Sequence, residues 1–325
     1  MTLKTLTRDD WLYLRRHSIG ASEAAAACGE SPYLSELELY ARKLGMMPDP
    51  DLGSIEHVRW GNLLEPAIVE ETCRRLDLRP LGIEESAERL GGSPDVEIVG
   101  ALEGRQLFLR SIPHPYMTAT LDGIAIDGDG ALVSIEAKNT SAWRLEDWQD
   151  GGSPGHYQIQ VVHQLAVAAP ISRGILAGLV GGNALKIAPA MRREDAPIAA
   201  LIEVERAFWK RVQSAQPPKA DGSASSASAL KALHPDDNGE SITLPLEMIA
   251  LHEELSQLED EAKQRSKKIE SLRVLLREAL GSNTYGILPN GQGRYSYKTQ
   301  TRVERTQPAS KSRVLRFSKA KGKTQ

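Results

Sequence analysis

The chain has 325 residues, a formal net charge of −3 and 41% hydrophobic residues, so it can bury a full core. No apolar run reaches the length of a membrane span and the start, MTLKTLTRDDW, lacks a signal-peptide core, which predicts a cytoplasmic protein without membrane contacts. Its two cysteines, Cys28 and Cys73, provide no disulfide framework and exclude a four-cysteine iron–sulfur cluster. Seven histidines are scattered without an HxH or HExxH pair, which argues against a zinc mechanism.

Two predicted helix starts in the first part of the chain carry polar residues. Ser22 precedes a helical run over residues 23–28, where free amides beside a hydroxyl suit a phosphate, although a serine there can also be a plain N-cap. Arg15 can grip a phosphate with two parallel hydrogen bonds, or it can form a surface salt bridge. Glu65 stands directly before a proline that predicts the first turn of a helix over residues 66–76. A glutamate there is often only a partner of the helix dipole.

A turn signature joins two predicted strands in the middle of the chain. The first strand covers residues 117–121 and is closed by Asp122. The second covers residues 131–135 and runs on to residue 138. The sequence DGDG at residues 127–130 lies between them and predicts a hairpin turn.

This predicted hairpin places acidic and basic groups together. Because side chains alternate across a strand, Glu136 and Lys138 share one face. If the two strands are neighbours, Asp122 lies beside Glu136, and the carboxylates offer hard oxygen donors to Mg²⁺ with Lys138 next to the ion. Such an arrangement is typical of nucleases, but a bare D…ExK also fits a solvated surface hairpin. Asp95 is a competing acid, yet it lies in residues 84–104, whose Gly, Pro and acidic content predicts a loop.

The following helix carries three glutamines. Gln158 shares a face with three apolar residues, so we expect its amide on the buried side, where it needs a polar partner. Gln160 and Gln164 form a separate polar stripe that solvent alone can satisfy. An amphipathic helix predicted over residues 197–212 closes one α/β domain, residues 1–215.

Residues 216–241 are rich in Pro, Gly, Ser and Asp and predict a linker to a C-terminal appendage, residues 242–325. The appendage begins with a helix roughly 50 Å long that requires a partner surface. Its heptad stripe consists of Met248, Leu251, Leu255, Leu258, Ala262, Arg265, Ile269, Leu272, Leu276 and Ala279. A hairpin follows over residues 285–305, with its turn at Asn290-Gly291. The basic tail after Gly293 either contacts phosphates or is a disordered solubilising end.

Four further elements, together with the central hairpin, resemble the lambda-exonuclease-like, YqaJ-type viral recombinase nucleases of the PD-(D/E)xK superfamily. They agree with this family in order and spacing. The elements are Trp11 to Arg15 with SIGASE at residues 18–23, Trp60-Gly61 with Glu65-Pro66, His114-Pro115 ahead of Asp122, and Tyr157 to Gln160.

The resemblance implies an α/β, restriction-endonuclease-like core, in which helices flank a central mixed β-sheet, with a long helix and a β-hairpin appended. It implies that one or two Mg²⁺ ions, for which Mn²⁺ can substitute, bind to Glu65, Asp122, Glu136 and the carbonyl of Ala137. It assigns catalysis to these three acids with Lys138 and Gln158. Contacts with the 5′ phosphate and DNA fall to Arg15, Ser22, Thr120, Gln158 and Gln160.

The implied activity is 5′ to 3′ exonuclease digestion of double-stranded DNA ends during phage-type homologous recombination in a bacterial cell. The digestion leaves 3′ overhangs for a single-strand annealing protein, and relatives form homo-oligomers. Two alternatives remain open. One is an endonuclease of the same superfamily, acting in restriction or junction cleavage, and the other is a non-catalytic DNA-binding recombination scaffold.

Overall fold

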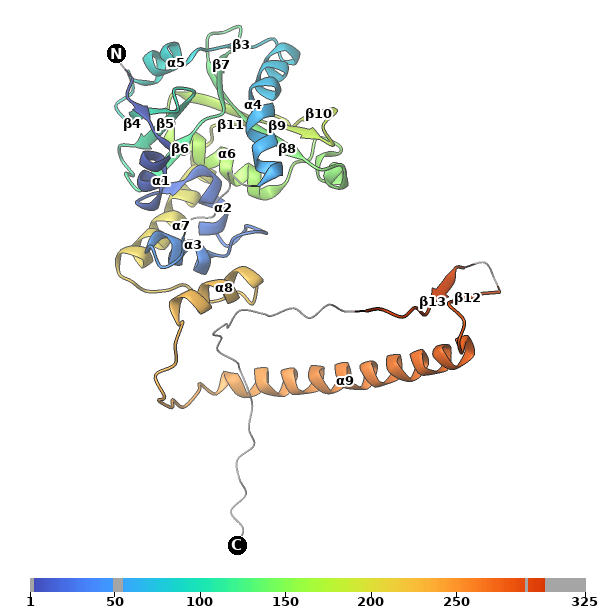
Figure 1. The fold of residues 1–325 in the computed structure, drawn as a ribbon. Coiled ribbons are helices and arrows are strands. Elements are labelled where there is room, and N and C mark those ends of the chain that lie inside the picture. Colours follow the sequence, from blue (N-terminus) through green and yellow to red (C-terminus); the bar gives the residue numbers. More distant parts are fainter. Residues whose placement is uncertain (1–2, 49–54, 290–291, 302–325) are drawn as a thin grey trace. The chain divides into compact units, whose positions relative to one another are not determined.

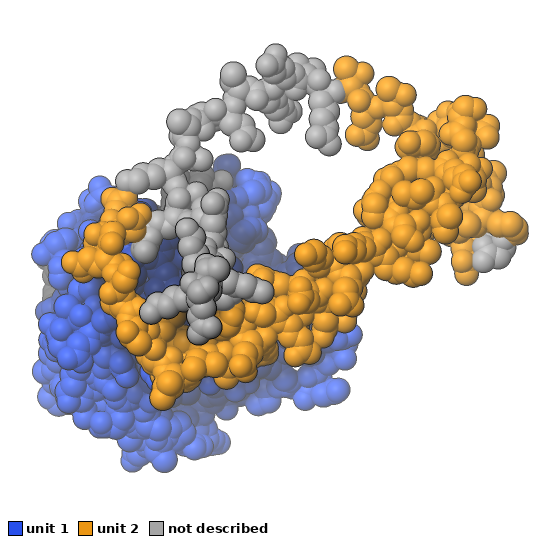
Figure 2. Space-filling view, turned by 90° about the horizontal axis from the view of Figure 1, so that it is seen from below, with its two compact units in different colours: residues 1–235 blue, residues 236–325 orange. Residues whose placement is uncertain are grey.

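The computed structural model describes residues 3–48, 55–289 and 292–301. The chain divides into two compact units, Met1–Pro235 and Asp236–Gln325, which are blue and orange in Figure 2. Among the described residues, no helix combines the length and the apolar character needed to cross a membrane.

Two mixed β-sheets form the centre of the first unit (Figure 1). One sheet has the order β1 (Thr5–Leu6), β4 (Val96–Leu102), β5 (Gln106–Ser111), β6 (Met117–Thr120), β2 (Ile19–Gly20). The other has the order β10 (Ala184–Ile187), β9 (Ile171–Val180), β8 (Leu132–Thr140), β7 (Gly123–Ile126), β3 (Arg79–Pro80), and β11 (Met191–Arg192) also pairs with β9. Only two residues, Leu121 and Asp122, separate β6 in the first sheet from β7 in the second.

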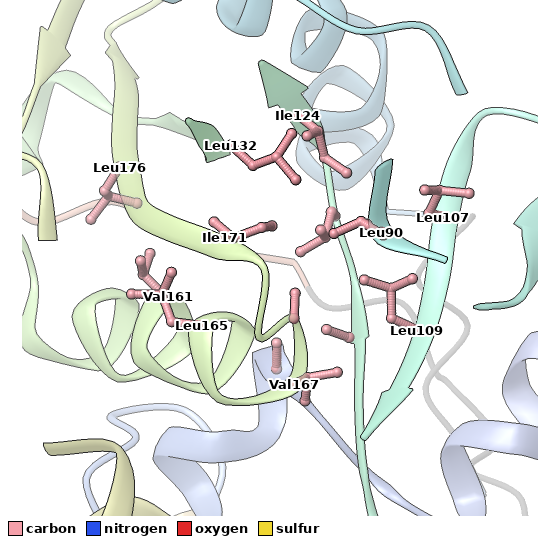
Figure 3. Close-up of a cluster of buried hydrophobic side chains, with 14 of the residues drawn as sticks. Leu90, Leu107, Leu109, Ile124, Leu132, Val161, Leu165, Val167, Ile171 and Leu176 are labelled. Atoms are coloured by element: carbon pink, nitrogen blue, oxygen red, sulfur yellow. The ribbon is translucent and has the colours of Figure 1, made fainter. Parts of the chain in front are cut away.

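Helices α4 (Glu56–Arg75) and α6 (Gly155–Val167) cover opposite faces of the second sheet. Cys73 of α4 belongs to a buried cluster with alternate residues of β7, β8 and β9, such as Ile135. Residues of α6, including Val161 and Leu165, pack with the residues that point the other way (Figure 3). The period-2 alternation of the strands therefore sorts their side chains between two helices.

Gly174 of β9 explains how closely α6 approaches the sheet. A Cβ atom built on Gly174 would lie 2.2 Å from the Cγ1 atom of Val161, which no side chain tolerates. The remaining helices of the unit are α1 (Arg8–Arg16), α2 (Ala24–Ala27), α3 (Glu36–Lys43), α5 (Ile83–Leu90), α7 (Asp195–Gln213) and α8 (Ala224–Leu233), with short 3₁₀ turns at Ala21–Glu23 and Ala142–Trp148.

These observations confirm the expected mixed α/β core flanked by helices, although its strands form two sheets where we predicted one central sheet. The closing helix, expected over residues 197–212, is α7. The loop predicted over residues 84–104 was wrong, because this stretch contains most of α5 and all of β4. Ala87 and Leu90 of α5 are buried at helical spacing, and this apolar pattern outweighs the Gly and Pro content around it.

Helix α8 lies within residues 216–241, for which composition predicted a linker. Ala229 of α8 is fully buried against α3 and α7. The hydroxyl of Ser225 donates to Glu38 Oε2 at 2.6 Å and accepts from the amide of Ser35 at 2.8 Å. The serine-rich composition thus provides specific contacts with the rest of the first unit.

The described part of the second unit contains α9 (Glu247–Leu280), β12 (Tyr285–Ile287) and β13 (Arg294–Ser296). The long helix and hairpin are as expected, and Gly281 ends the helix with a φ of 53°. The predicted turn at Asn290-Gly291 and the basic tail from residue 302 onward lie outside the described residues.

Candidate active site

Asp122 lies at the junction between the two sheets. The amide of Ala137 on β8 donates to Asp122 Oδ2 at 3.0 Å, so Asp122 is held beside Glu136. The strand pairing that places Asp122 there differs from the prediction. The antiparallel neighbour of β8 is β7, which sequence analysis missed, and the predicted partner β6 pairs with β5 instead.

Glu136 and Lys138 share one face of β8, and that face is covered by α6. Glu136 is buried, with 2% of its side chain exposed, and its Oε1 atom accepts from Lys138 Nζ. Gln160 Nε2 donates to Glu136 Oε1 at 2.6 Å, and Gln164 Nε2 donates to Glu136 Oε2 at 2.5 Å. Lys138 Nζ also lies 4.9 Å from the centre of the Tyr157 ring. Both carboxylate oxygens therefore have fixed donors.

Glu65 reaches the same place from α4. The helix predicted to start at Pro66 instead starts at Glu56, so Glu65 lies in mid-helix and Pro66 is tolerated inside it. Val69, one turn beyond Glu65, packs on Gly123, where a Cβ atom would lie only 2.5 Å from Val69 Cγ1. Because residues four apart share a helix face, this close approach brings Glu65 over Asp122.

A single amide nitrogen bridges these two acids. Gln106 Nε2 on β5 donates to Glu65 Oε1 at 2.6 Å and to Asp122 Oδ1 at 3.1 Å. Sequence analysis missed Gln106, because nothing in the pattern of β5 distinguishes its first residue from an ordinary strand end.

The cluster of acids is electrostatically strained. Burial, together with the charge of Glu136, raises the pKa of Glu65 to about 7 despite its hydrogen bond from Gln106. Burial and the charges of Glu136 and Glu65 raise the pKa of Asp122 well above its usual range. Burial alone would lower the pKa of Lys138, but the charges of Glu136 and Asp122 outweigh it and raise that pKa. The site thus holds more negative charge than its single ammonium group balances.

The chemistry of the donor set fits a divalent cation. Three carboxylates are the hard oxygen ligands that Mg²⁺ prefers, and a cation would relieve the repulsion that raises the pKa values of Glu65 and Asp122. The side-chain Oε1 atom of Gln164 is buried, on the amide group that bonds Glu136, and has no hydrogen-bond partner among the described residues. Yet in the described parts of the chain no three His, Cys, Asp or Glu side chains converge as a ready-made ion site. The amide donors of Gln106, Gln160 and Gln164 hold the acids instead.

The three glutamines of α6 are placed differently from the prediction. Gln158, expected on the buried side, is exposed, and its Nε2 atom donates to the carbonyl and hydroxyl oxygens of Ser153. Gln160 and Gln164, expected on a solvated stripe, are buried and bind Glu136. Val161 and Leu165 are buried as the apolar periodicity predicted, but the buried face also includes Gln160 and Gln164, because α6 packs on a strand that carries the buried Glu136.

A second polar cluster surrounds Arg15 at the end of α1. Arg15 Nη2 donates to Ser22 Oγ at 3.0 Å and lies 3.1 Å from Glu23 Oε1, and its guanidinium carbon is 4.5 Å from the centre of the Trp11 ring. Glu23 also accepts from Lys43 Nζ at 2.7 Å. Burial would raise the pKa of Glu23, but the charges of Arg15 and Lys43 prevail and lower it to about 2. Glu23 therefore stays ionised and fixes Arg15.

Trp11 links this cluster to the acidic one. Its Nε1 atom donates to Thr120 Oγ1 at 2.9 Å. Thr120 precedes Asp122 by two residues, so their Cα atoms are at most about 7 Å apart. The structure thus connects the Arg15 cluster, through Trp11 and Thr120, to the chain segment that carries Asp122.

Comparison with known proteins finds a family model that matches part of this chain and a similar full-length protein. Residues 10–170 match the YqaJ-like viral recombinase domain. The matched residues of this domain include both polar clusters, from Arg15 to Gln164. The uncharacterized protein YqaJ of Bacillus subtilis (strain 168) is 26% identical over 309 residues, which are 92% of this chain and 86% of that protein.

Solved structures resemble part of this chain only distantly. LHK-Exo in complex with dAMP is 16% identical with a TM-score of 0.47, covering 64% of this chain and 94% of that one. The alkaline exonuclease LHK-Exo from Laribacter hongkongensis is 18% identical with a TM-score of 0.45 and the same coverage. With TM-scores below 0.5, these likenesses carry no weight in the assignment below.

Proposed function

We propose that this chain is a Mg²⁺-dependent exonuclease that digests double-stranded DNA from its 5′ ends. The observation that carries the proposal is the grouping of Glu65, Asp122 and Glu136 around one junction, with Lys138 against Glu136. The YqaJ-like recombinase domain supports DNA as the substrate.

Glu65, Asp122 and Glu136, with the carbonyl of Ala137, would hold one or two Mg²⁺ ions, and Mn²⁺ would substitute. A bound ion would supply Lewis-acid charge to the phosphate and lower the pKa of an attacking water. Gln160 and Gln164 orient Glu136, and a fixed carboxylate loses no freedom when it acts as a ligand.

Lys138 places a positive charge at the edge of this cluster. Its side chain is 20% exposed, whereas that of Glu136 is 2% exposed, so the ammonium group can meet a substrate that the buried carboxylate cannot reach. It would orient the water or stabilise the charge that develops on the phosphate oxygens. Gln158 is not part of this mechanism, because its amide is bonded to Ser153.

The cluster of Arg15, Ser22 and Thr120 would bind the 5′ phosphate. The guanidinium group of Arg15 contacts Glu23 and the Trp11 ring, and it has five N–H donors, so it can also bind a phosphate. A phosphate pocket that is linked to the Asp122 segment through Thr120 would position the first phosphodiester bond for cleavage, which favours digestion from an end over internal cutting.

We place this activity in the cytoplasm of a bacterial cell, where the 3′ overhangs would serve a single-strand annealing protein. Overhang polarity can be mapped on a linear duplex labelled at either end: loss of the 5′ label with retention of the 3′ label is expected. Loss of the 3′ label first would contradict the direction.

The overall proposal is tested with linear and covalently closed circular duplex DNA, each with and without Mg²⁺. Only the linear DNA with Mg²⁺ should disappear. Cutting of the circular DNA would indicate an endonuclease of the same superfamily, and intact DNA under all four conditions would indicate a non-catalytic DNA-binding protein.

A further inference from the structure

Helix α9 is a 34-residue helix with an uncovered apolar face. Within the described residues, Leu280 is its only buried residue. Leu255, Leu258, Ile269 and Leu272 of the heptad stripe are each about half exposed, between 48% and 55%. An isolated helix gains little stability in water unless its apolar face is packed, and so large an exposed apolar row marks an interaction surface.

We propose that α9 pairs with α9 of a second copy of this chain as an antiparallel coiled coil. The proposal is independent of the nuclease activity. The residues that would face each other across the heptad stripe indicate both the partner, a second copy of α9, and the antiparallel orientation of the two helices.

The antiparallel register matches every layer of the heptad stripe. Along an antiparallel pair, the residue number rises on one helix as it falls on the other, so facing residues have a constant sum. With this register, Leu255 faces Leu272 of the second copy, Leu258 faces Ile269, and Ala262 faces Arg265. The long Arg265 side chain thus meets the smallest neighbour in the row and can extend past it to water. In a parallel pair, Arg265 would face Arg265 at the centre of the seam, which places two like charges together.

The flanking charges distinguish the two directions in the same way. In the antiparallel register, Glu261 lies beside Lys268 of the second copy, and symmetry forms this pair twice. In a parallel pair, Lys268 would lie beside Arg273 and Glu254 beside Glu259, so both flanks would repel. The antiparallel pair is therefore the one that the sequence of α9 stabilises.

Sedimentation or light scattering of the full chain, without DNA, measures the association directly. We expect twice the mass of one chain, with dissociation on dilution. Leu258→Glu should weaken the dimer roughly 100-fold or more, because it buries a charge against Ile269 in two symmetric layers. Val274→Glu is the matched control: Val274 is 51% exposed on the opposite side of α9, and its replacement should leave the dimer unchanged.

Lys268→Glu distinguishes the directions while leaving the helix intact. In an antiparallel pair it opposes Glu261 and should weaken the dimer roughly tenfold or more, since two attractive contacts become repulsive. Adding Glu261→Lys should restore most of the affinity. Stronger association of Lys268→Glu would indicate a parallel pair and overturn the proposal. A monomer at all concentrations, or an assembly that Leu258→Glu leaves intact, would also overturn it.

Discussion

Replacing Gln164 by leucine tests whether the structure locates the residues that orient the central carboxylate. Gln164 Nε2 supplies the hydrogen bond to Glu136 Oε2, at 2.5 Å, in a position that is 1% exposed. A hydrogen bond to a charged acceptor contributes about 1.5–3 kcal/mol, which corresponds to a factor of about 10–100. Mutation of the groups that orient metal ligands typically lowers metal affinity by a similar factor, about 10–100-fold.

The assay is a Mn²⁺ titration by calorimetry without DNA, followed by a Mg²⁺ titration of nucleotide release from linear duplex. Gln164→Leu should bind Mn²⁺ about 10–100-fold more weakly and require correspondingly more Mg²⁺. Gln158→Leu is the matched control, because Gln158 lies on the same helix but is exposed and bonded to Ser153. If Gln164→Leu behaves like the wild type while Gln158→Leu loses affinity, the reasoning is wrong and the original sequence-based placement was better.

Three other predictions address the remaining groups. Lys138→Ala should abolish digestion of linear duplex while a gel-shift assay still detects DNA binding; digestion near the wild-type rate would remove Lys138 from the site. Wild-type protein should digest 5′-phosphorylated duplex faster than 5′-hydroxyl duplex, and Arg15→Ala should lose this preference while the surface variant Arg74→Ala keeps it; equal wild-type rates on both substrates would eliminate the phosphate pocket. The buried pair of His163 and Glu205, with Nδ1 2.7 Å from Oε1, should stabilise the fold most at low pH. Burial lowers the pKa of His163, but the nearby carboxylates of Glu205 and Glu23 and its hydrogen bonds outweigh burial and raise that pKa above 6.5. The stabilisation is therefore full below pH 6.5 and is lost as the pH rises through the folded pKa. His163→Gln should lower the free energy of unfolding, measured with urea, by about 3–5 kcal/mol at low pH and by less at high pH. A decrease that does not depend on pH would show that the pair is not ionic.

Local patterns predicted the elements whose signals are contained in one segment. The helical period of α9, its terminal glycine and the amphipathic face of α7 each depend on residues a few positions apart, and the structure has these helices. Alternation along β8 likewise placed Glu136 and Lys138 on one face, because this geometry needs no knowledge of neighbouring strands.

The errors arose where the answer depends on residues far apart in the chain. Strand β7 has only four residues and was overlooked. The sequence analysis therefore paired β8 with β6, whereas its antiparallel neighbour is β7. Gln106 joins the site through a strand 16 positions before Asp122, and no local pattern carries that information. The buried face of α6 is set by the carboxylate of Glu136 on the sheet below, which hydropathy alone cannot detect. Glutamines usually face solvent, but a glutamine can be buried where a polar group inside the core accepts its hydrogen bond.

If Asp122 and its neighbouring acids hold the metal ion required for cleavage of DNA, removing the charge of Asp122 should abolish digestion. The most direct test is the Mg²⁺-dependent release of nucleotides from linear duplex by Asp122→Asn and by the wild type, with folding monitored by urea unfolding. We expect Mg²⁺-dependent release by the wild type and none by the folded variant at any Mg²⁺ concentration. Release by Asp122→Asn at the wild-type rate and the same Mg²⁺ dependence would contradict the claim.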